Sequence, residues 1–262
     1  LIINFMPKPP ISVFIITKNE ADRIIPIINA VKNIADEILV IDSGSTDKTM
    51  EIASNLGAKV VYNQWMGYGP QKVFGENLCH NNWILNIDAD EEVSEELALE
   101  IKHLFFENKQ DQFAGYKIKI VNKFFDEKKP KKLAYYYNQF RLYNKKYAGF
   151  QDSIIHDSVV LKDGFRNNKI GQLKNIIAHQ SFRSFEHWID KINSYSSAQA
   201  LEALKKGKNP PAFKILFTPI FAFLKAYFIR RYFIYGFDGL IYSSVFAFGR
   251  LIKLVKARQL FK

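Results

Sequence analysis

Apolar and polar positions in the first hundred residues form two alternating kinds of segment. Short, nearly continuous runs of apolar residues, such as ISVFIIT at 11–17, are typical of strands buried on both faces of a parallel sheet. Between these runs apolar residues recur at helical spacing, as the isoleucines of 21–33 do. The pattern predicts strands at 11–17, 37–41, 58–62 and 83–87, and helices at 21–33, at 48–56 and from the glycine-rich stretch at 67–69 to residue 79. We therefore expect an α/β fold, a mostly parallel sheet flanked by helices.

Polar residues stand at the carboxyl ends of three of these predicted strands. They are Thr17, Asp42 and Asp88. In open α/β sheets ligands bind outside the carboxyl ends of the strands. The sequence therefore predicts a binding site at this edge of the sheet.

The pattern changes beyond residue 97. A helix over about 94–106 and a strand over 115–121 precede a polar, tyrosine-rich region that reaches about residue 178. From Ser184 the apolar residues fit one face of a long helix, and the Asn-Pro-Pro break at 209–211 separates it from the C-terminal segment. We expect a first domain over 1–183 and a C-terminal helical region over 184–262.

The net charge distinguishes the end of the chain from the rest. The 262 residues include 37 Lys or Arg and 26 Asp or Glu, and twelve of the basic residues but only one acid, Asp238, lie in 205–262. This segment holds the whole net charge of +11, which usually marks an anionic partner.

Cys79 is the single cysteine, so an intramolecular disulfide and a cysteine-based zinc site are excluded and a reducing compartment is favoured.

The basic segment is also rich in aromatic and aliphatic residues. Apolar faces beside Lys and Arg are typical of interfacial helices, so we expect 211–258 to lie on an anionic membrane surface. The alternative is a helical subdomain that packs its apolar face on the first domain. Nucleic acid is disfavoured, because long aliphatic residues are mixed with the aromatic ones and no groove-reading motif is present.

We expect neither a secretory signal at the N-terminus nor a clean transmembrane span. A span needs about 20 apolar residues. The best stretches, 215–224 and 239–248, end at Lys225 and Arg250.

The tripeptide Asp88-Ala89-Asp90 is the first candidate for chemistry. Two carboxylates at the end of a buried strand repel each other until a hard cation joins them, and Mg²⁺ or Mn²⁺ held this way leaves room for substrate phosphates. The alternative is that DADEE is an acidic helix N-terminus, stabilised by the helix dipole. The loop IDSGSTDKT favours the first interpretation, because Asp42 stands there beside small residues and a helix N-terminus that suit a nucleotide.

These motifs occur in the order and spacing of a known family. The motifs are FIITKNEADRI, ILVIDSGSTDKT, WMGYGPQK at 65–72, WILNIDADEEVSEEL, FRLYNKK at 140–146, IIHDSVV at 154–160 and the apolar, basic C-terminus. The sequence resembles the family 2 glycosyltransferases, which have the GT-A fold (Rossmann-like). Within them it is most similar to the bacterial lipopolysaccharide core group, the KdtX/WaaE-like enzymes, over almost the whole chain.

The resemblance implies a nucleotide-sugar donor, a divalent metal and inversion at the anomeric carbon. A UDP-hexose is expected as donor, with glucose favoured by the resemblance alone. Thr17 and Glu20 would lie beside the nucleotide and Asp42 on the uracil or ribose. Asp88 and Asp90 would flank the diphosphate, with Asp90 the direct ligand of Mg²⁺ or Mn²⁺.

An inverting transfer also needs a base that takes the proton of the acceptor hydroxyl. In the resembling subgroup this motif is His followed by an acid, commonly Glu, and here His156 and Asp157 occupy the place. We expect Asp157 to be the base and His156 to orient it or the acceptor. The shorter Asp departs from the pattern, and Asp152 competes for the role; a strand end with a structural histidine is the plain alternative.

Four further positions are open between a site role and a structural one. Lys72 would add positive charge near the diphosphate, or it is an exposed helix lysine. Arg141 would pair with a substrate phosphate or brace a carboxylate of the site. His179 is more often structural than functional at such a strand end, and packing is the safer interpretation of the tyrosines at 135–137.

Together these features predict a metal-dependent, inverting glycosyltransferase, peripheral on the cytoplasmic face of a bacterial inner membrane. Its acceptor would be a lipid-anchored glycan such as the lipopolysaccharide inner core. A polyprenyl phosphate or another envelope glycan is the enzymatic alternative, and an inactive membrane adaptor with the same fold is the alternative from another class. A nucleotidyltransferase is disfavoured, because TKNEADR has no glycine for a phosphate loop.

Overall fold

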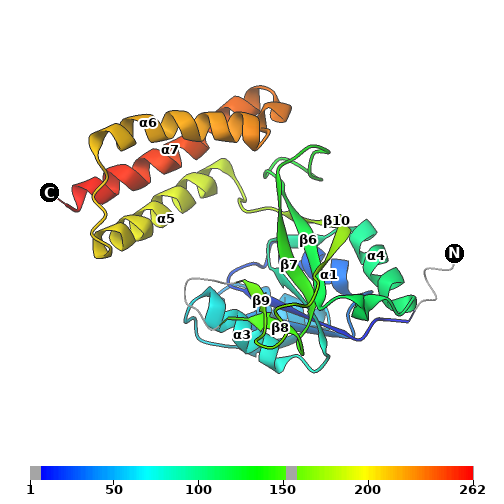
Figure 1. Cartoon of the computed structure of the whole chain (residues 1–262). Helices are drawn as coiled ribbons and strands as arrows, with labels where there is room; N and C mark the ends of the chain where they lie inside the picture. Colours follow the sequence, from blue (N-terminus) through cyan, green and yellow to red (C-terminus); the bar gives the residue numbers. More distant parts are fainter. Residues whose placement is uncertain (1–6, 152–157, 262) are drawn as a thin grey trace. The chain divides into compact units, whose positions relative to one another are not determined.

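The computed structural model describes residues 7–151 and 158–261, which divide into two compact units (Figure 1). The sheet unit comprises Leu1–Val121 and Tyr136–His179. The helical unit comprises Asn122–Tyr135 and Gln180–Lys262. The sequence analysis placed a boundary at 183/184 and assigned 122–135 to the first domain, whereas here 122–135 groups with the helical unit.

The sheet unit is built on an eight-stranded sheet in the order β3-β2-β1-β4-β7-β6-β10-β5. The strands are β1 (Ile11–Thr17), β2 (Glu37–Asp42), β3 (Lys59–Tyr62), β4 (Trp83–Asp88), β5 (Glu91–Val93), β6 (Gly115–Asn122), β7 (Tyr136–Asn144) and β10 (Gly171–His179). A separate two-stranded sheet pairs β8 (Ala148–Phe150) with β9 (Val159–Leu161). The helices are α1 (Ile24–Val31), α2 (Thr49–Asn55), α3 (Tyr68–Leu78) and α4 (Glu95–Phe106), with a 3₁₀ turn at Gln110–Gln112.

The four strands predicted from sequence form the parallel half of this sheet. Thr17 pairs with Asp42 across β1 and β2, and Ile16 pairs with Asp88 across β1 and β4. The three predicted site positions therefore end neighbouring strands at one edge. The other half contains antiparallel pairs, β4 with β7, β6 with β7 and β10 with β5. The prediction of an α/β fold with a mostly parallel sheet flanked by helices is confirmed.

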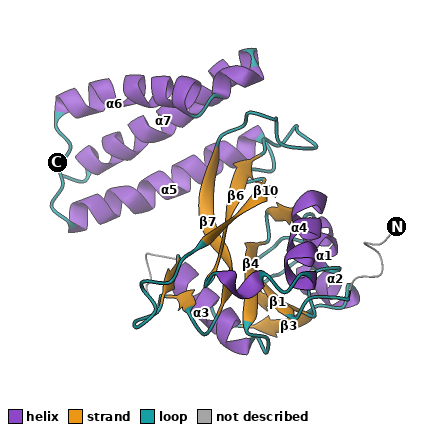
Figure 2. Cartoon of the chain, turned by 45° about the vertical axis from the view of Figure 1, so that its right-hand side comes forward, coloured by secondary structure: helices purple, strands orange, loops and turns teal. Residues whose placement is uncertain are grey.

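Helices cover both faces of the parallel half, which explains why its strands are apolar at nearly every position. Ile11, Val13 and Ile15 of β1 pack in one core with α1, α2 and α4, whereas Phe14 and Ile16 face the other core, which includes Phe74 of α3. In Figure 2, α1, α2 and α4 lie together on one side of the strands and α3 lies on the other.

The helical unit contains three long helices. They are α5 (Phe185–Lys205), α6 (Ala212–Leu224) and α7 (Phe237–Gln259), with a π-helical turn at Lys225–Ile229 and a 3₁₀ turn at Tyr232–Tyr235. Ser184 caps α5 by accepting a hydrogen bond from the backbone N–H of His187. The 122–135 segment joins this unit through Phe124, whose ring stacks on Tyr242 at a centroid distance of 3.9 Å.

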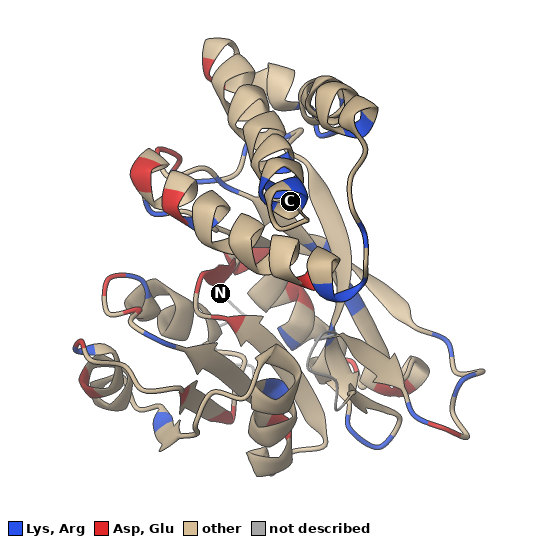
Figure 3. Ribbon diagram, turned by 90° about the vertical axis from the view of Figure 1, so that its left-hand side faces the viewer, with Lys and Arg blue, Asp and Glu red and all other residues tan. Residues whose placement is uncertain are grey.

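The helix α6 exposes most of its apolar residues. Within Ala212–Ile229 the chain is long and apolar enough to cross a membrane by length and composition, and only 11% of that window is buried. The expectation of no clean span is corrected here: the helix continues through Lys225 into the π-helical turn, so the charge does not end it. On α7, Figure 3 shows that the basic positions gather toward the C-terminal end.

Candidate active site

Asp88, the last residue of β4, lies at the centre of a charged cluster. Its carboxylate is 3.0 Å from Lys72 Nζ and 3.3 Å from a terminal nitrogen of Arg141. Lys72 belongs to α3 and is only 1% exposed, so the interpretation of this residue as an exposed helix lysine is wrong. A helix and an antiparallel strand thus bring two cations to one carboxylate.

The guanidinium of Arg141 is engaged by the protein. It lies 2.6 Å from Glu91 and donates a hydrogen bond of 2.7 Å to the side-chain oxygen of Asn86. Glu91 in turn accepts a 3.0 Å hydrogen bond from the backbone N–H of Asp88. Of the two roles considered for Arg141, the described geometry shows the bracing one.

The sequence analysis assigned no role to Glu91 or Asn86. Asn86 had a signal, because it is a polar residue in the middle of an apolar strand, where only a partner makes its burial tolerable. Glu91 gave no such signal. It lies in β5, which the structure shows to be a short strand, and the helix α4 begins only at Glu95 after the cap Ser94. The interpretation of DADEE as a helix N-terminus is therefore wrong.

The surrounding charges keep Asp88 ionised. Burial alone would raise the pKa of Asp88, but the charges of Lys72 and Arg141 outweigh burial and hold that pKa well below its usual range. For Glu91 burial dominates and raises the pKa, although Arg141 opposes it. The cluster therefore presents a permanent negative charge at Asp88.

Asp90 lies two residues further, beside a histidine at the end of β10. His179 Nε2 is 3.4 Å from the carboxylate of Asp90, and its Nδ1 is 3.3 Å from the hydroxyl of Tyr137. Burial raises the pKa of Asp90, but the hydrogen bond and the charge of His179, together with the charge of Arg23, outweigh burial and lower that pKa. Tyr137 also packs against the larger core, as the packing interpretation expects, whereas Tyr136 of the same run is exposed.

The loop after β2 is organised by Asp42. This fully buried carboxylate accepts hydrogen bonds of 2.8 Å from the backbone N–H groups of Gly44 and Ser45, and it also accepts one from the Ser45 hydroxyl. Gly44 has φ of 99°, a conformation that favours glycine. Opposite Asp42, the Thr17 hydroxyl is buried and has no hydrogen-bond partner among the described residues. An unpaired buried hydroxyl is costly, so a ligand that reaches it would gain from the contact.

Glu20 is held by a neighbour on the same loop. Its carboxylate is 2.7 Å from Arg23, and its backbone N–H donates to the hydroxyl of Thr49. Arg23 also contributes to the low pKa of Asp90. The structure thus links the Glu20 loop electrostatically to the predicted metal ligand, a role of Arg23 that the sequence did not indicate.

The predicted base cannot be placed. His156, Asp157 and its competitor Asp152 lie outside the described residues. Their assignment stays a prediction from the resemblance.

A divalent cation fits the donor atoms at the end of β4. In the described part of the chain no three His, Cys, Asp or Glu residues converge to hold a metal by themselves. Asp88 and Asp90 nevertheless place two carboxylates two residues apart at the end of β4, where Oδ1 of Asp88 faces Lys72 Nζ at 3.0 Å and Asp90 faces His179. Mg²⁺ normally binds through one or two carboxylates and substrate phosphates, so Asp88 and Asp90 would hold it only together with a diphosphate.

Comparisons with known proteins show the family to which the chain belongs. The family model "Glycosyl transferase family 2" matches residues 12–168. An "Uncharacterized glycosyltransferase" of Rickettsia bellii (strain RML369-C) is 50% identical over 254 residues, which cover 95% of this chain and 86% of that protein. The "Lipopolysaccharide core biosynthesis glycosyltransferase LpsC" of Rhizobium meliloti (strain 1021) is 28% identical over 272 residues, with 97% and 95% covered.

Solved structures add little beyond this. The crystal structure of S. aureus TarS 1-349 covers 95% of this chain and 89% of that one at 13% identity, with a TM-score of 0.43. A likeness at this level supports no residue-by-residue comparison. The extent of the family match and the high identity to the Rickettsia relative decide the question: this chain belongs to glycosyl transferase family 2, and it is a glycosyltransferase with a GT-A-like fold.

Proposed function

We propose that this glycosyltransferase moves a hexose, with glucose favoured, from a UDP-sugar to a lipid-anchored acceptor such as the lipopolysaccharide inner core. One observation carries the donor side of the proposal. The carboxylate of Asp88 is held ionised at the end of β4 between Lys72 and Arg141, with Asp90 two residues further, in a family 2 chain.

The residues at the strand ends define how the donor would bind. Thr17 offers a buried hydroxyl without a described partner, and Asp42 shapes the loop that would receive the uracil and ribose. Glu20 would stand beside the nucleotide through its pair with Arg23. Lys72 and Arg141 would act on the diphosphate through Asp88, which they fix in place.

The reaction exchanges one bond at the anomeric carbon for another. The acceptor oxygen forms a bond to this carbon while the bond between the carbon and the diphosphate oxygen breaks, and UDP leaves with the electron pair of the broken bond. Mg²⁺ or Mn²⁺, when bound, offsets the negative charge that grows on the leaving diphosphate. Asp157 would accept the hydroxyl proton, oriented by His156, and inversion follows if a single displacement takes place.

The acceptor is proposed from two independent supports. The LpsC relative is named for lipopolysaccharide core biosynthesis and is matched over nearly its whole length. The exposed apolar face of α6 and the basic end of α7 suit an anionic membrane surface. We propose a peripheral position on the cytoplasmic face of the bacterial inner membrane, because the charged Lys214 and Lys225 within the apolar segment suit an interfacial helix better than a spanning one. Transfer to a polyprenyl phosphate would use the same donor site.

Calorimetric titration with UDP tests the donor site. We expect UDP to bind in Mn²⁺ and to lose most of its affinity in EDTA or in Asp90→Ala, because the cation joins the diphosphate to the carboxylates. Asp111→Ala, which removes an exposed carboxylate from the 3₁₀ turn, is the matched control and should bind UDP normally.

Two results would contradict the proposal in different ways. Binding of another nucleoside diphosphate in place of UDP would overturn the donor while leaving the site. Equal UDP binding with and without metal, unchanged in Asp90→Ala, would overturn the metal-dependent mechanism.

A further inference from the structure

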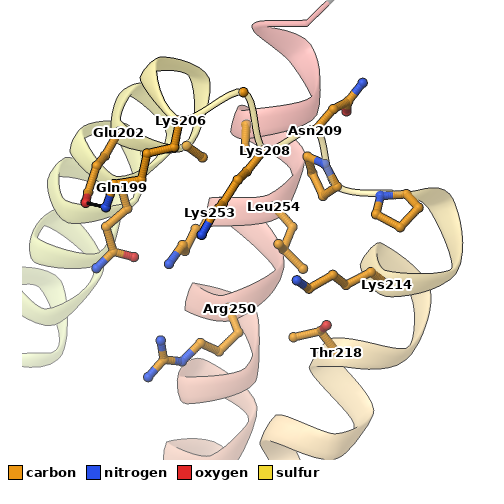
Figure 4. Close-up of a pocket in the computed structure, with 15 residues that line it drawn as sticks. Gln199, Glu202, Lys206, Lys208, Asn209, Lys214, Thr218, Arg250, Lys253 and Leu254 are labelled. Carbon is orange, nitrogen blue, oxygen red and sulfur yellow. Dashed lines mark hydrogen bonds and ion pairs between the residues drawn. The ribbon is translucent and has the colours of Figure 1, made fainter.

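The helical unit contains a cavity of about 750 Å³ that the donor site does not use. It opens to solvent and is lined by α5, the 206–211 connection, α6 and the last part of α7, all within the helical unit. Two prolines, Pro210 and Pro211, form part of its wall and fix the course of the connection. Figure 4 shows these elements around the cavity.

The lining of this cavity is strongly basic. It contains Lys206, Lys208, Lys214, Lys253 and Arg250, and Glu202 is its single acid. Glu202 forms an ion pair with Lys206 and so neutralises one of the five cations. Within the described part of the chain, the other four have no carboxylate within 4.0 Å.

Three of these cations come from different elements. Figure 4 shows Lys208 extending from the connection, Lys214 from α6 and Lys253 from α7, each directed into the cavity. Their convergence has an electrostatic cost that an anion would relieve. Asn209 and Thr218 add neutral hydrogen-bonding groups to the lining.

An apolar stripe runs along α6 directly beside this basic lining. Phe213, Phe217 and Phe221 are 67%, 48% and 66% exposed and follow one another at intervals of four residues. Lys214 and Thr218, which line the cavity, each follow one of these phenylalanines, a rotation of about 100° around the helix axis. An anion that sits in the cavity therefore has an exposed apolar surface next to it.

We propose that this cavity binds the phosphate group of an anionic membrane lipid whose acyl chains lie along the exposed stripe of α6. The lipid is favoured over free phosphate because only an amphiphile satisfies the cations and the stripe at once. The inference rests on the membrane association in the proposed function, and it goes further by assigning one headgroup to one pocket. A general attraction between a basic tail and an anionic surface would need no pocket.

A short-chain lipid, used below the concentration at which it forms micelles, separates these cases. We expect dihexanoyl phosphatidic acid to bind saturably to the full chain with one site, and dihexanoyl phosphatidylcholine to bind much more weakly. The variant Lys208→Gln/Lys253→Gln should lose at least about tenfold in affinity, because two charge-assisted contacts are removed. The matched control Lys205→Gln/Lys225→Gln removes the same charge from exposed positions outside the cavity and should stay within about twofold.

Three outcomes would overturn the proposal. They are the absence of saturable binding, an equal loss of affinity in the two double variants, and inorganic phosphate binding as tightly as the short-chain lipid, which would make the cavity a free-phosphate site. UDP titration of the same preparations keeps the two proposals apart. A chain that binds the lipid but not UDP would refute the proposed donor and leave this pocket standing, whereas UDP binding without lipid binding would refute the pocket alone.

Discussion

At the scale of single residues, the candidate site is a balanced set of buried charges. Arg141 of β7 contacts both Glu91 and Asp88, and Lys72 contacts Asp88 from the helix α3. Each charge is tolerated only because its partners are in place, since removing one member of a buried pair leaves an uncompensated charge. The same arrangement fixes the position of Asp88, which the proposed reaction at a diphosphate requires.

Arg141→Met tests this balance. We expect it to lower the free energy of unfolding by about 3–5 kcal/mol, because two carboxylates lose their partner. Urea unfolding without ligand measures the loss, and Glu91→Leu added to Arg141→Met should recover part of it.

The matched control is Arg166→Met. Arg166 pairs with Asp163 at 2.8 Å, but the two side chains are 79% and 91% exposed, so its loss should cost no more than about 1 kcal/mol. A cost for Arg141→Met as small as that of the control would contradict the proposed balance.

At the scale of elements, the short strands β5 and β8 hold buried carboxylates in place. The three-residue strand β5 is held in the sheet by its antiparallel pairing with β10, in which Glu91 lies opposite His179. A similar contact joins α3 to β8, where Glu76 accepts a hydrogen bond from the backbone N–H of Phe150. Burial raises the pKa of Glu76, although the hydrogen bonds and nearby lysines oppose it.

This raised pKa predicts a pH dependence of stability. The folded chain binds the proton of Glu76 more tightly than the unfolded chain does, so the free energy of unfolding should fall as pH rises from the unfolded pKa, near 4.5, through the folded pKa. Glu76→Gln keeps an acceptor for Phe150 and removes the charge. The free energy of unfolding of Glu76→Gln minus that of the wild type should therefore be larger at pH 8 than at pH 4.

Urea midpoints of both proteins at the two pH values measure this difference. Glu107→Gln serves as the control, because Glu107 is exposed and pairs only with Lys109 among the described residues. If the difference between Glu76→Gln and the wild type is the same at both pH values, the carboxyl of Glu76 does not have a raised pKa.

At the scale of the whole molecule, the chain passes between its two units at 121/122, at 135/136 and at 179/180. The segment Asn122–Tyr135 interrupts the sheet unit and contributes to the core of the helical unit. Phe124 is its anchor, with its ring near those of Trp188, Tyr232, Tyr235 and Tyr242. The C-terminal helices therefore need a part of the chain that lies about sixty residues before them in sequence.

Phe124→Ala should destabilise the helical unit by about 3–5 kcal/mol, because it empties a buried aromatic site. Hydrogen exchange should show faster exchange in α5 and α7 and unchanged exchange in β1 and β4, since the sheet unit has its own cores. Phe213→Ala is the matched control, because Phe213 is 67% exposed and its loss should stay within about 0.5 kcal/mol. Equal effects of the two substitutions would show that 122–135 does not contribute to the helical core.

The sequence by itself determined the parallel half of the sheet and the strand ends at which the candidate site lies. Buried parallel strands are apolar throughout, so their ends are visible where Thr17, Asp42 and Asp88 interrupt the pattern. It also determined the family, through motifs that are each a short contiguous stretch of the chain. The long helix after Ser184 was readable for the same reason, because its apolar spacing and its cap are local.

Only the tertiary structure decided how the site is held together and how the units divide. Lys72, Arg141 and Glu91 meet Asp88 through pairings between distant elements, and no local pattern encodes which partner a charged residue will find. The strands β7 and β8 were missed, and of β10 only its end at His179 was expected, because polar and aromatic residues obscure the alternation in this region. The role of Phe124 could not be predicted for a related reason. Its ring packs against aromatic rings that follow it by about 60 to 120 residues in sequence, and only the folded chain brings them into contact.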